Sequence, residues 1–273
     1  LKDRRLGATI VAVPGTVRGL ALAHARFGSL PWKQVVAPAI RLAIKGYQVD
    51  RHLAGSLNHV LSSKDSAPFE EMRRVYAAPN GDSWQDGDRM LQPDLATTLR
   101  KIAQSGAPGF YSGPVAEAIV KEMQEDGGLI TAKDLAKYEA NVRRPIHGPF
   151  RGFDIYGPPL PSSGGIALVQ MLNILEIFDL RSQGPMSPNT IHLTIEAMRR
   201  AFLDRARYLG DDRFVAVPQF LTSKSYAAQL ASQIDPNKAT TSVSLASDIP
   251  LSGEGSSTTH FSVVDANGMA VSN

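Results

Sequence analysis

Four consecutive polar residues near the carboxyl end of the chain, Ser257, Thr258, Thr259 and His260, contain its best candidate for a nucleophile. A threonine hydroxyl attacks a carbonyl group only after a base removes its proton, and a free amine on the same residue can be that base. Thr258 would gain such an amine if the peptide bond between Ser257 and Thr258 were broken. The sequence therefore suggests a threonine that acts first on its own chain and afterwards on a substrate.

The segments on either side of Thr258 suit such a cleavage. Residues 245–257 are rich in Ser, Gly, Asp and Pro and have no apolar period, which predicts a flexible loop. Residues 259–271 alternate in polarity around the turn pair Asn267-Gly268, which predicts a β-hairpin. The strand would hold the hydroxyl still while the loop lets the departing carbonyl move away. Threonine pairs are also common at the starts of strands, so a purely structural role stays open.

Three other groups of residues have both a chemical and a structural interpretation. Residues 162–165, Ser-Ser-Gly-Gly, connect a predicted strand to a predicted helix. Their N–H groups could hold an anion, or the segment could be a helix cap and a tight connection. Residues 211–212, Asp-Asp, could belong to a metal site or form a polar turn. His52 and His59 fit an exposed or structural role better than a ligand role.

The composition excludes several classes of protein. The 273 residues are 43% hydrophobic and 20% charged, which is typical of soluble globular proteins. Basic residues are interleaved with acidic ones and the net charge is only +3, so no nucleic-acid groove is indicated. Cysteine is absent, and so are nucleotide-binding and zinc motifs and any apolar run of about 18 residues. These absences weigh against a nucleotide-binding site and a zinc site, and we expect no nucleic-acid partner.

Helical patterns with clear start and stop signals fill most of the chain. Pro38 is expected to kink or divide one helix, and the longest helix is expected to bury Ile191, Ile195, Met198 and Phe202 on one face. The expected strands cover residues 9–13 and 153–156, and the expected helices cover residues 16–27, 31–45, 49–74, 95–104, 115–125, a stretch opened by Thr131, 166–177 and 188–209.

Five motifs are spread over nearly the whole chain: Val-Pro-Gly-Thr-Val at 13–17, Gly-Gly-Leu-Ile-Thr at 127–131, Pro-Ser-Ser-Gly-Gly at 161–165, Asp-Arg followed by Tyr-Leu-Gly-Asp within 204–211, and Thr-Thr-His-Phe-Ser-Val-Val-Asp at 258–265. Together they resemble the gamma-glutamyltransferase family of N-terminal-nucleophile hydrolases. The last motif is specific, because in this family its first threonine opens the small subunit after autocatalytic cleavage.

The resemblance implies an α+β fold, the four-layer αββα sandwich of this superfamily. Residues 1–257 would form most of the large subunit, and residues 258–273 would begin the small subunit that is its partner. Thr258 would attack Ser257 during processing and then a gamma-glutamyl substrate such as glutathione, with an amino acid, a peptide or water as acceptor. Thr259 and His260 would support the site. No cofactor is implied, and export to the periplasm or the cell exterior is expected.

The same resemblance implies that the chain is a fragment. The arginine for the substrate carboxylate would precede Leu1, and the oxyanion hole would follow Asn273. Because an oxyanion hole supplies the largest part of many amide-cleaving rate enhancements, we expect the 273-residue chain alone to release no amine from a gamma-glutamyl anilide. Two alternatives stay open: a related cephalosporin or glutaryl-type acylase, and a family member that keeps the fold without cleaving itself.

Overall fold

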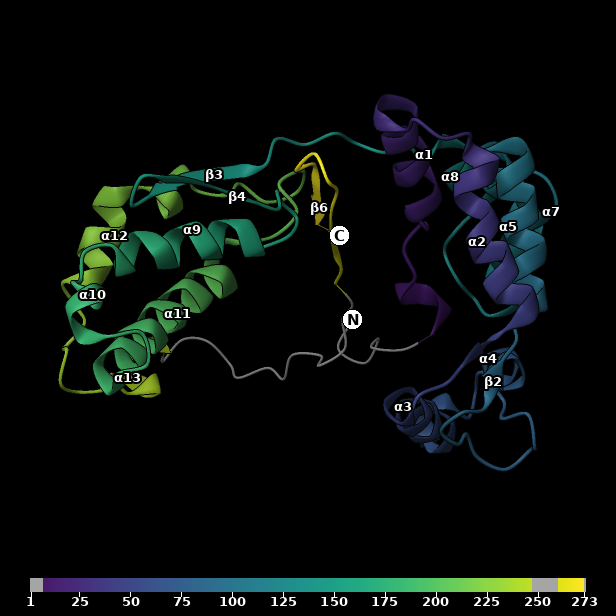
Figure 1. The fold of residues 1–273 in the computed structure, drawn as a ribbon, viewed down its shortest axis with the longest axis horizontal. Helices are drawn as coiled ribbons and strands as arrows, with labels where there is room; N and C mark the ends of the chain where they lie inside the picture. The colour runs from purple at the N-terminus through teal and green to yellow at the C-terminus, as the bar shows by residue number, and fades with distance from the viewer. Residues whose placement is uncertain (1–6, 247–259, 273) are drawn as a thin grey trace. The chain divides into compact units, whose positions relative to one another are not determined.

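The computed structural model describes residues 7–246 and 260–272, and in these residues it combines helices with small antiparallel sheets (Figure 1). This arrangement confirms the predicted α+β class. Two compact units divide the chain, Leu1–Val142 and Arg143–Asn273. The predicted subunit boundary between Ser257 and Thr258 lies outside the described residues and stays a prediction. No helix in the described ranges has both the length and the apolar character needed to cross a bilayer.

The first unit is built mainly from helices. Its elements in chain order are η1 (Ala8–Ile10), α1 (Thr16–Phe27), α2 (Trp32–Lys45), β1 (Tyr47–Gln48), α3 (Arg51–Ser62), η2 (Lys64–Ser66), α4 (Glu70–Val75), β2 (Arg89–Met90), α5 (Pro93–Ser105), α6 (Pro108–Tyr111), α7 (Pro114–Glu125) and α8 (Ala132–Lys137). Strands β1 and β2 pair antiparallel, and α2 packs along α5.

Most of the predicted helices are confirmed. Their ends lie at local sequence signals, which is why the sequence could predict them. Prolines in the first turn begin α5 and α7. Thr131 and Asp134 form a capping box at α8, in which each side chain accepts a hydrogen bond from the other residue's backbone N–H. Gly46 ends α2 with a φ of 73°. Helix α2 runs through Pro38 without a break, so the predicted division is wrong.

Two predictions for the first unit are corrected. Residues 9–13 form no strand, because a strand requires a partner for its backbone groups and none of the described segments pairs with this one. The segment contributes Val13 to a packed cluster instead. Residues 49–74 are two helices, α3 and α4, separated by a 3₁₀ turn at Lys64–Ser66.

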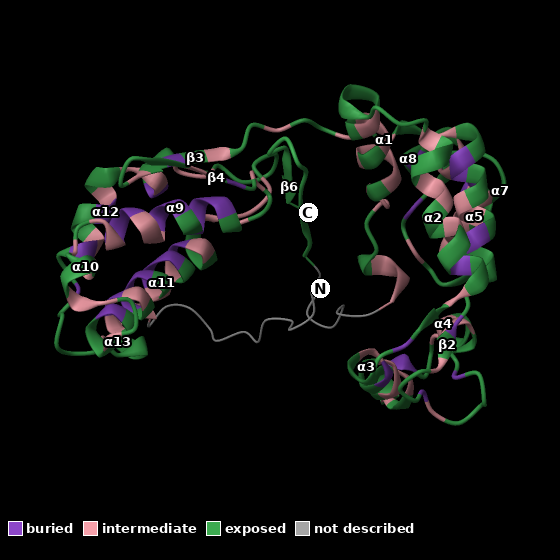
Figure 2. Ribbon diagram, viewed as in Figure 1, coloured by how far each residue is buried: buried purple, intermediate pink, exposed green. Residues whose placement is uncertain are grey.

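Buried residues of the first unit form two clusters. Figure 2 marks the buried positions along the ribbon. One cluster contains Trp84, whose indole N–H donates to the Tyr76 carbonyl at 2.8 Å. Asn58 fixes the same residue from α3, because its side-chain amide donates to the Trp84 carbonyl at 2.9 Å and accepts from the Trp84 N–H at 2.8 Å. The other cluster centres on Tyr111 and Leu135. Each cluster joins elements that are distant in sequence.

The second unit begins with a hairpin and continues as a layer of helices. Its elements in chain order are β3 (Ile146–Phe150), β4 (Phe153–Gly157), α9 (Gly164–Leu175), α10 (Leu180–Gln183), α11 (Pro188–Tyr208), η3 (Gln219–Thr222), α12 (Lys224–Ala231), α13 (Ser242–Ala246), β5 (Ser262–Val264) and β6 (Ala270–Ser272). Ser187 caps α11 by accepting a hydrogen bond from the N–H of Thr190, as predicted.

The β3–β4 hairpin pairs Ile146 with Gly157 and Phe150 with Phe153. Arg151 and Gly152 both have positive φ, 48° and 85°, as a two-residue hairpin turn of type I′ requires. Strand β4 confirms the strand predicted over residues 153–156, whereas β3 was not predicted. Gly and Pro in the middle of β3 hide its strand character in the sequence.

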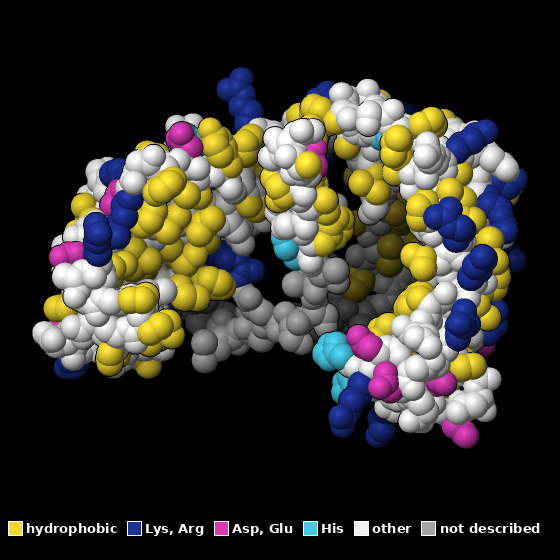
Figure 3. Space-filling view, in the orientation of Figure 1, with side chains coloured by type: hydrophobic (Ala, Val, Ile, Leu, Met, Phe, Trp, Pro, Cys, Tyr) yellow, Lys and Arg dark blue, Asp and Glu magenta, His cyan; other side chains and the backbone are white. Residues whose placement is uncertain are grey.

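Helix α11 buries a different face from the predicted one. Its buried apolar residues Leu193 and Ala197 join Ile174 of α9 and the apolar side of α12 in one cluster. Ile191, Ile195, Met198 and Phe202 keep 42–48% of their surface exposed. Figure 3 shows hydrophobic side chains gathered over this part of the second unit. The buried face also carries charged residues, which an apolar pattern cannot reveal.

Candidate active site

Only one of the four predicted site residues lies in the described part of the chain. Ser257, Thr258 and Thr259 fall outside it, so their predicted roles stay predictions. His260 is exposed, and its Nε2 lies 2.9 Å from the Ser262 hydroxyl oxygen. This contact engages a ring nitrogen of His260, which precedes strand β5 (Ser262–Val264), with the first residue of that strand.

A hairpin follows the predicted nucleophile, as expected. Strands β5 and β6 pair Val263 with Val271, and β5 starts at Ser262 instead of the predicted Thr259. Only Gly268 of the turn has positive φ, 84°, so the turn is not the two-residue type that the Asn-Gly pair suggested. Asp265 stabilises it, because its carboxylate accepts hydrogen bonds from two turn N–H groups at 2.9 Å.

Before the predicted site in the sequence, α11 binds the chain at Thr240. We call the residues that make these contacts the Thr240 clamp: Glu196, Arg199, Arg200 and Thr240. The N–H of Thr240 donates to Oε1 of Glu196 at 3.0 Å, and its hydroxyl donates to Oε2 at 2.7 Å. The Thr240 carbonyl accepts from Arg199. All three polar groups of Thr240 are therefore bound by α11.

Glu196 is the centre of the Thr240 clamp, because its carboxylate also accepts from Arg199 at 2.9 Å and from Arg200. Glu196 and Arg200 are only 1% and 2% exposed. Burial by itself raises the pKa of Glu196, but hydrogen bonds from Thr240 and Arg200 outweigh it and lower the pKa to about 2. The spacing of the three charged residues indicates a helical ion pair, but sequence reasoning missed its burial.

A second buried carboxylate, Asp204, lies two turns further along α11, within the Asp-Arg motif. It accepts from the Gln170 amide of α9 and from the Tyr226 hydroxyl of α12, the latter at 2.9 Å. Burial, and after it the hydrogen bond to Asp204, raises the pKa of Tyr226. The motif therefore ties three helices together.

The Ser-Ser-Gly-Gly turn at residues 162–165 is a tight connection. The hydroxyl of Ser163 makes no cap hydrogen bond and accepts instead from Nε of Arg205 at 3.0 Å. Gly165 is buried where α9 meets β4. A Cβ on Gly165 would lie 2.3 Å from the Pro158 carbonyl oxygen, closer than atoms can approach.

Gly165→Ala is expected to destabilise the second unit by about 1–3 kcal/mol, because backbone atoms around this position must move. Gly164→Ala is the matched control. Its Cβ would meet Pro158 and Ser162 at ordinary distances of 3.5 and 3.6 Å, so we expect a change near zero. Thermal unfolding followed by circular dichroism measures both, and equal effects of the two variants would contradict the packing argument.

The remaining candidate sites have structural explanations. Asp211 contacts Arg213 at 2.7 Å and Asp212 contacts Arg143 at 2.5 Å, as a polar turn would. The pKa of Asp211 falls to about 2 because Arg213 donates to it. His52 and His59 are exposed. Within residues 7–246 and 260–272, no three His, Asp or Glu side chains are grouped as metal ligands.

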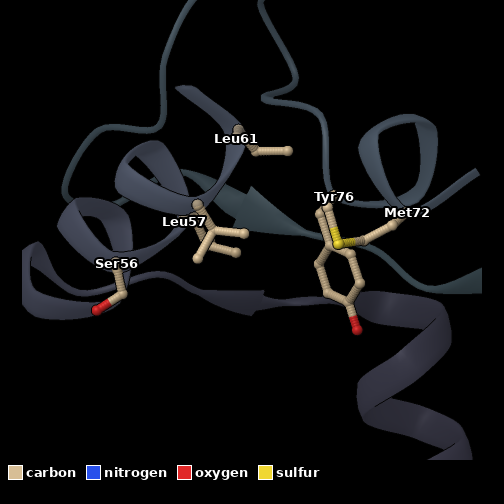
Figure 4. A pocket seen from close by; sticks show the side chains of 6 residues that line it. Ser56, Leu57, Leu61, Met72 and Tyr76 are labelled. Carbon is tan, nitrogen blue, oxygen red and sulfur yellow. The ribbon is translucent and has the colours of Figure 1, made fainter. Parts of the chain in front are cut away.

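A hollow of about 220 Å³ opens in the first unit between α3 and the end of α4. Figure 4 shows Leu57 and Leu61 on one side of it, with Met72 and Tyr76 on the other. Its surface is apolar. It offers no pair of titratable groups for acid–base chemistry.

Comparison with known proteins identifies the class and then the family. The crystal structure of Helicobacter pylori gamma-glutamyltranspeptidase matches with a TM-score of 0.84 and 37% identity, covering 94% of this chain and 73% of that one. The shared fold places the chain in the N-terminal-nucleophile hydrolase class and confirms the predicted fold. The gamma-glutamyltranspeptidase family model matches residues 2–273. The chain belongs to this enzyme family.

Two relatives show how much of a family member the chain represents. The "Glutathione hydrolase proenzyme" of Escherichia coli (strain K12) is 44% identical over 259 residues, which are 94% of this chain and 44% of that protein. The "Acylase ACY 1 proenzyme" of Pseudomonas sp. (strain SE83) is 39% identical over 274 residues, 99% of this chain and 48% of that protein. The chain thus spans about half the length of these relatives.

Proposed function

We propose that the protein to which this chain belongs is a self-cleaving glutathione hydrolase and gamma-glutamyltransferase. The observation that carries the proposal is the family match over residues 2–273, together with the intact Thr258 motif within it. The names of the relatives support processing, since they describe proenzymes. The large subunit would end at Ser257, and its partner, the small subunit, would begin at Thr258.

Processing would begin when the Thr258 hydroxyl attacks the carbonyl carbon of Ser257. The C–N bond breaks, the nitrogen takes the hydroxyl proton, and an ester joins the two residues. Water then hydrolyses the ester, which leaves a carboxylate on Ser257 and frees both the amine and the hydroxyl of Thr258. No cofactor enters these steps.

Turnover would use the same hydroxyl. The free amine of Thr258 accepts the hydroxyl proton as the oxygen attacks the gamma-carbonyl of glutathione, and it returns the proton to the departing amine. The gamma-glutamyl ester then passes to water, an amino acid or a peptide. Because a ring nitrogen of His260 is engaged by Ser262, we assign the general base to the amine, with Thr259 and His260 holding the start of the strand.

A glutaryl or cephalosporin acylase is the second candidate, favoured by the 39% identity to the Pseudomonas acylase. A matched pair of substrates separates the two activities: a gamma-glutamyl anilide and a glutaryl anilide, which differ only in the alpha-amino group. The complete protein is assayed with both. A site built to bind that ammonium group is expected to prefer the gamma-glutamyl anilide by at least about 100-fold in kcat/KM. Preference for the glutaryl anilide would instead establish the acylase.

We also propose export of the complete protein to the periplasm or the cell exterior, on the strength of the family resemblance alone. Fractionation of cells that express the complete gene tests this location. Recovery of processed protein only in the cytoplasmic fraction would contradict it.

A further inference from the structure

The Thr240 clamp binds the chain at Thr240, near the predicted end of the large subunit. Ser257, which processing would convert into a carboxyl terminus, follows Thr240 by 17 residues in the sequence. The carboxylate of Glu196 receives both the N–H and the hydroxyl of Thr240. Such charge-assisted hydrogen bonds are stronger than neutral ones, above all in a buried setting.

The segment that leads to Thr240 is also held on α11. Arg200 donates to the Gln233 carbonyl at 2.9 Å, and Nε2 of His192 lies 2.8 Å from the Asp235 carbonyl oxygen. Ile234, in the same segment, belongs to the apolar cluster between α9, α11 and α12. Dissociation of this segment from α11 would therefore expose core side chains and break polar contacts.

The contacts between α11 and the next residues are weaker. Within the described residues, Ser242 receives one side-chain hydrogen bond from α11, from Arg199 at 3.2 Å, and the Arg199 side chain is 25% exposed. Helix α13 itself buries no residue. Thr240 therefore marks a sharp change in how firmly the chain is held.

We propose that the Thr240 clamp is a boundary that stops unravelling of the carboxyl terminus created by processing. Fresh chain ends fray unless hydrogen bonds or burial hold them. After cleavage, residues 241–246 would be free to leave α11, while residues 233–240 would stay bound and keep the core covered. This inference rests on the proposed processing between Ser257 and Thr258.

The clamp is expected to act after cleavage and to have little influence on the cleavage rate. The entropy of closing a loop grows only slowly with its length, so freeing the few residues before Thr240 should change the cleavage rate by less than about twofold. Retention of residues 233–240 after cleavage depends on the contacts directly.

Thr240→Val in the complete, processed protein tests the boundary. Valine keeps the shape of the side chain and the backbone contacts but removes the hydroxyl that donates a hydrogen bond to Glu196. Glu196 remains paired with Arg199 and Arg200. The processed protein is treated with carboxypeptidase Y, and the mass of the large subunit is followed over time. Thr241→Val is the matched control, because among the described residues the Thr241 hydroxyl hydrogen-bonds to Ser244 and not to α11.

Wild type and Thr241→Val are expected to be trimmed to an end point between residues 240 and 246, where digestion slows. Thr240→Val should pass this point about tenfold faster, the factor that corresponds to one lost hydrogen bond. Equal trimming of all three proteins past residue 240, or a cleavage defect in Thr240→Val without faster trimming, would overturn the proposal.

Hydrogen exchange of the complete protein carrying Thr258→Ala, which is expected to stay uncleaved, separates failure of the clamp from failure of processing. The amide of Thr240 should exchange at least about tenfold more slowly than that of Thr241, since only the former donates to a buried carboxylate. Fast exchange at Thr240 overturns the clamp in any state of the protein. If the Thr240 amide exchanges slowly but the complete wild-type protein never cleaves itself, the proposed function is refuted. The contacts that hold residues 233–240 on α11 would still be established.

Discussion

Thr258→Ala in the complete protein is expected to give one uncleaved polypeptide and to reduce gamma-glutamyl turnover by about 10⁴-fold or more, since both processing and catalysis lose their nucleophile. The wild type should give two bands on a denaturing gel, and the smaller one should begin at Thr258. Amino-terminal sequencing of that band and a gamma-glutamyl anilide assay measure the two effects.

Thr259→Ala is the control for this experiment, because it removes the same hydroxyl one residue later. We expect it to be cleaved and to keep measurable activity. A small subunit that begins at Thr259 would transfer the role to that residue. A fully active wild type that remains a single band would overturn self-cleavage altogether.

Glu196→Gln is expected to destabilise the second unit by about 3–5 kcal/mol. The substitution leaves two arginines, one of them fully buried, without the carboxylate that neutralises them. Glu176→Gln is the matched control, since Glu176 pairs with Lys224 at the surface, where such pairs contribute at most about 1 kcal/mol.

The two tryptophans offer a way to assign this effect to one unit. Trp32 and Trp84 both belong to the first unit, so tryptophan fluorescence reports on that unit, whereas far-ultraviolet circular dichroism reports on the helices of both. In Glu196→Gln, urea unfolding followed by circular dichroism should shift much more than the fluorescence transition. An equal shift of both signals would show that the damage is not confined to the second unit.

The contribution of Glu196 to stability should depend on pH with a defined sign. Its pKa is lowered from 4.5 to about 2 by folding, so the folded state favours the ionised carboxylate. The stabilisation is therefore complete above pH 4.5 and is lost as the pH falls toward 2. The difference in unfolding free energy between wild type and Glu196→Gln should be constant from neutral pH to about pH 5 and then shrink. A difference that grows on acidification would contradict this assignment.

The sequence alone determined the features that depend on neighbouring residues. Ser187 and Pro188 define the start of α11, Thr131 and Asp134 define the start of α8, and Gly268 lies in the turn of the last hairpin. Caps and turns are made within a few residues, so their signals survive without knowledge of the rest of the fold. The family is a similar case, since the motif around Thr258 indicated it and the comparison confirmed it, while the role of Thr258 as nucleophile stays a prediction.

Only the tertiary structure decided which surfaces are buried. Helix α11 has an apolar stripe through Ile195 that stays exposed, and it buries Glu196, whose carboxylate accepts two hydrogen bonds from Thr240, a residue distant in sequence. Strand β3 exists because β4 pairs with it. In each case the deciding partner is remote along the chain, and local periodicity carries no information about remote partners. The sequence thus located the predicted nucleophile, while packing between α11 and residues 233–240 decided how the chain leading to it is held.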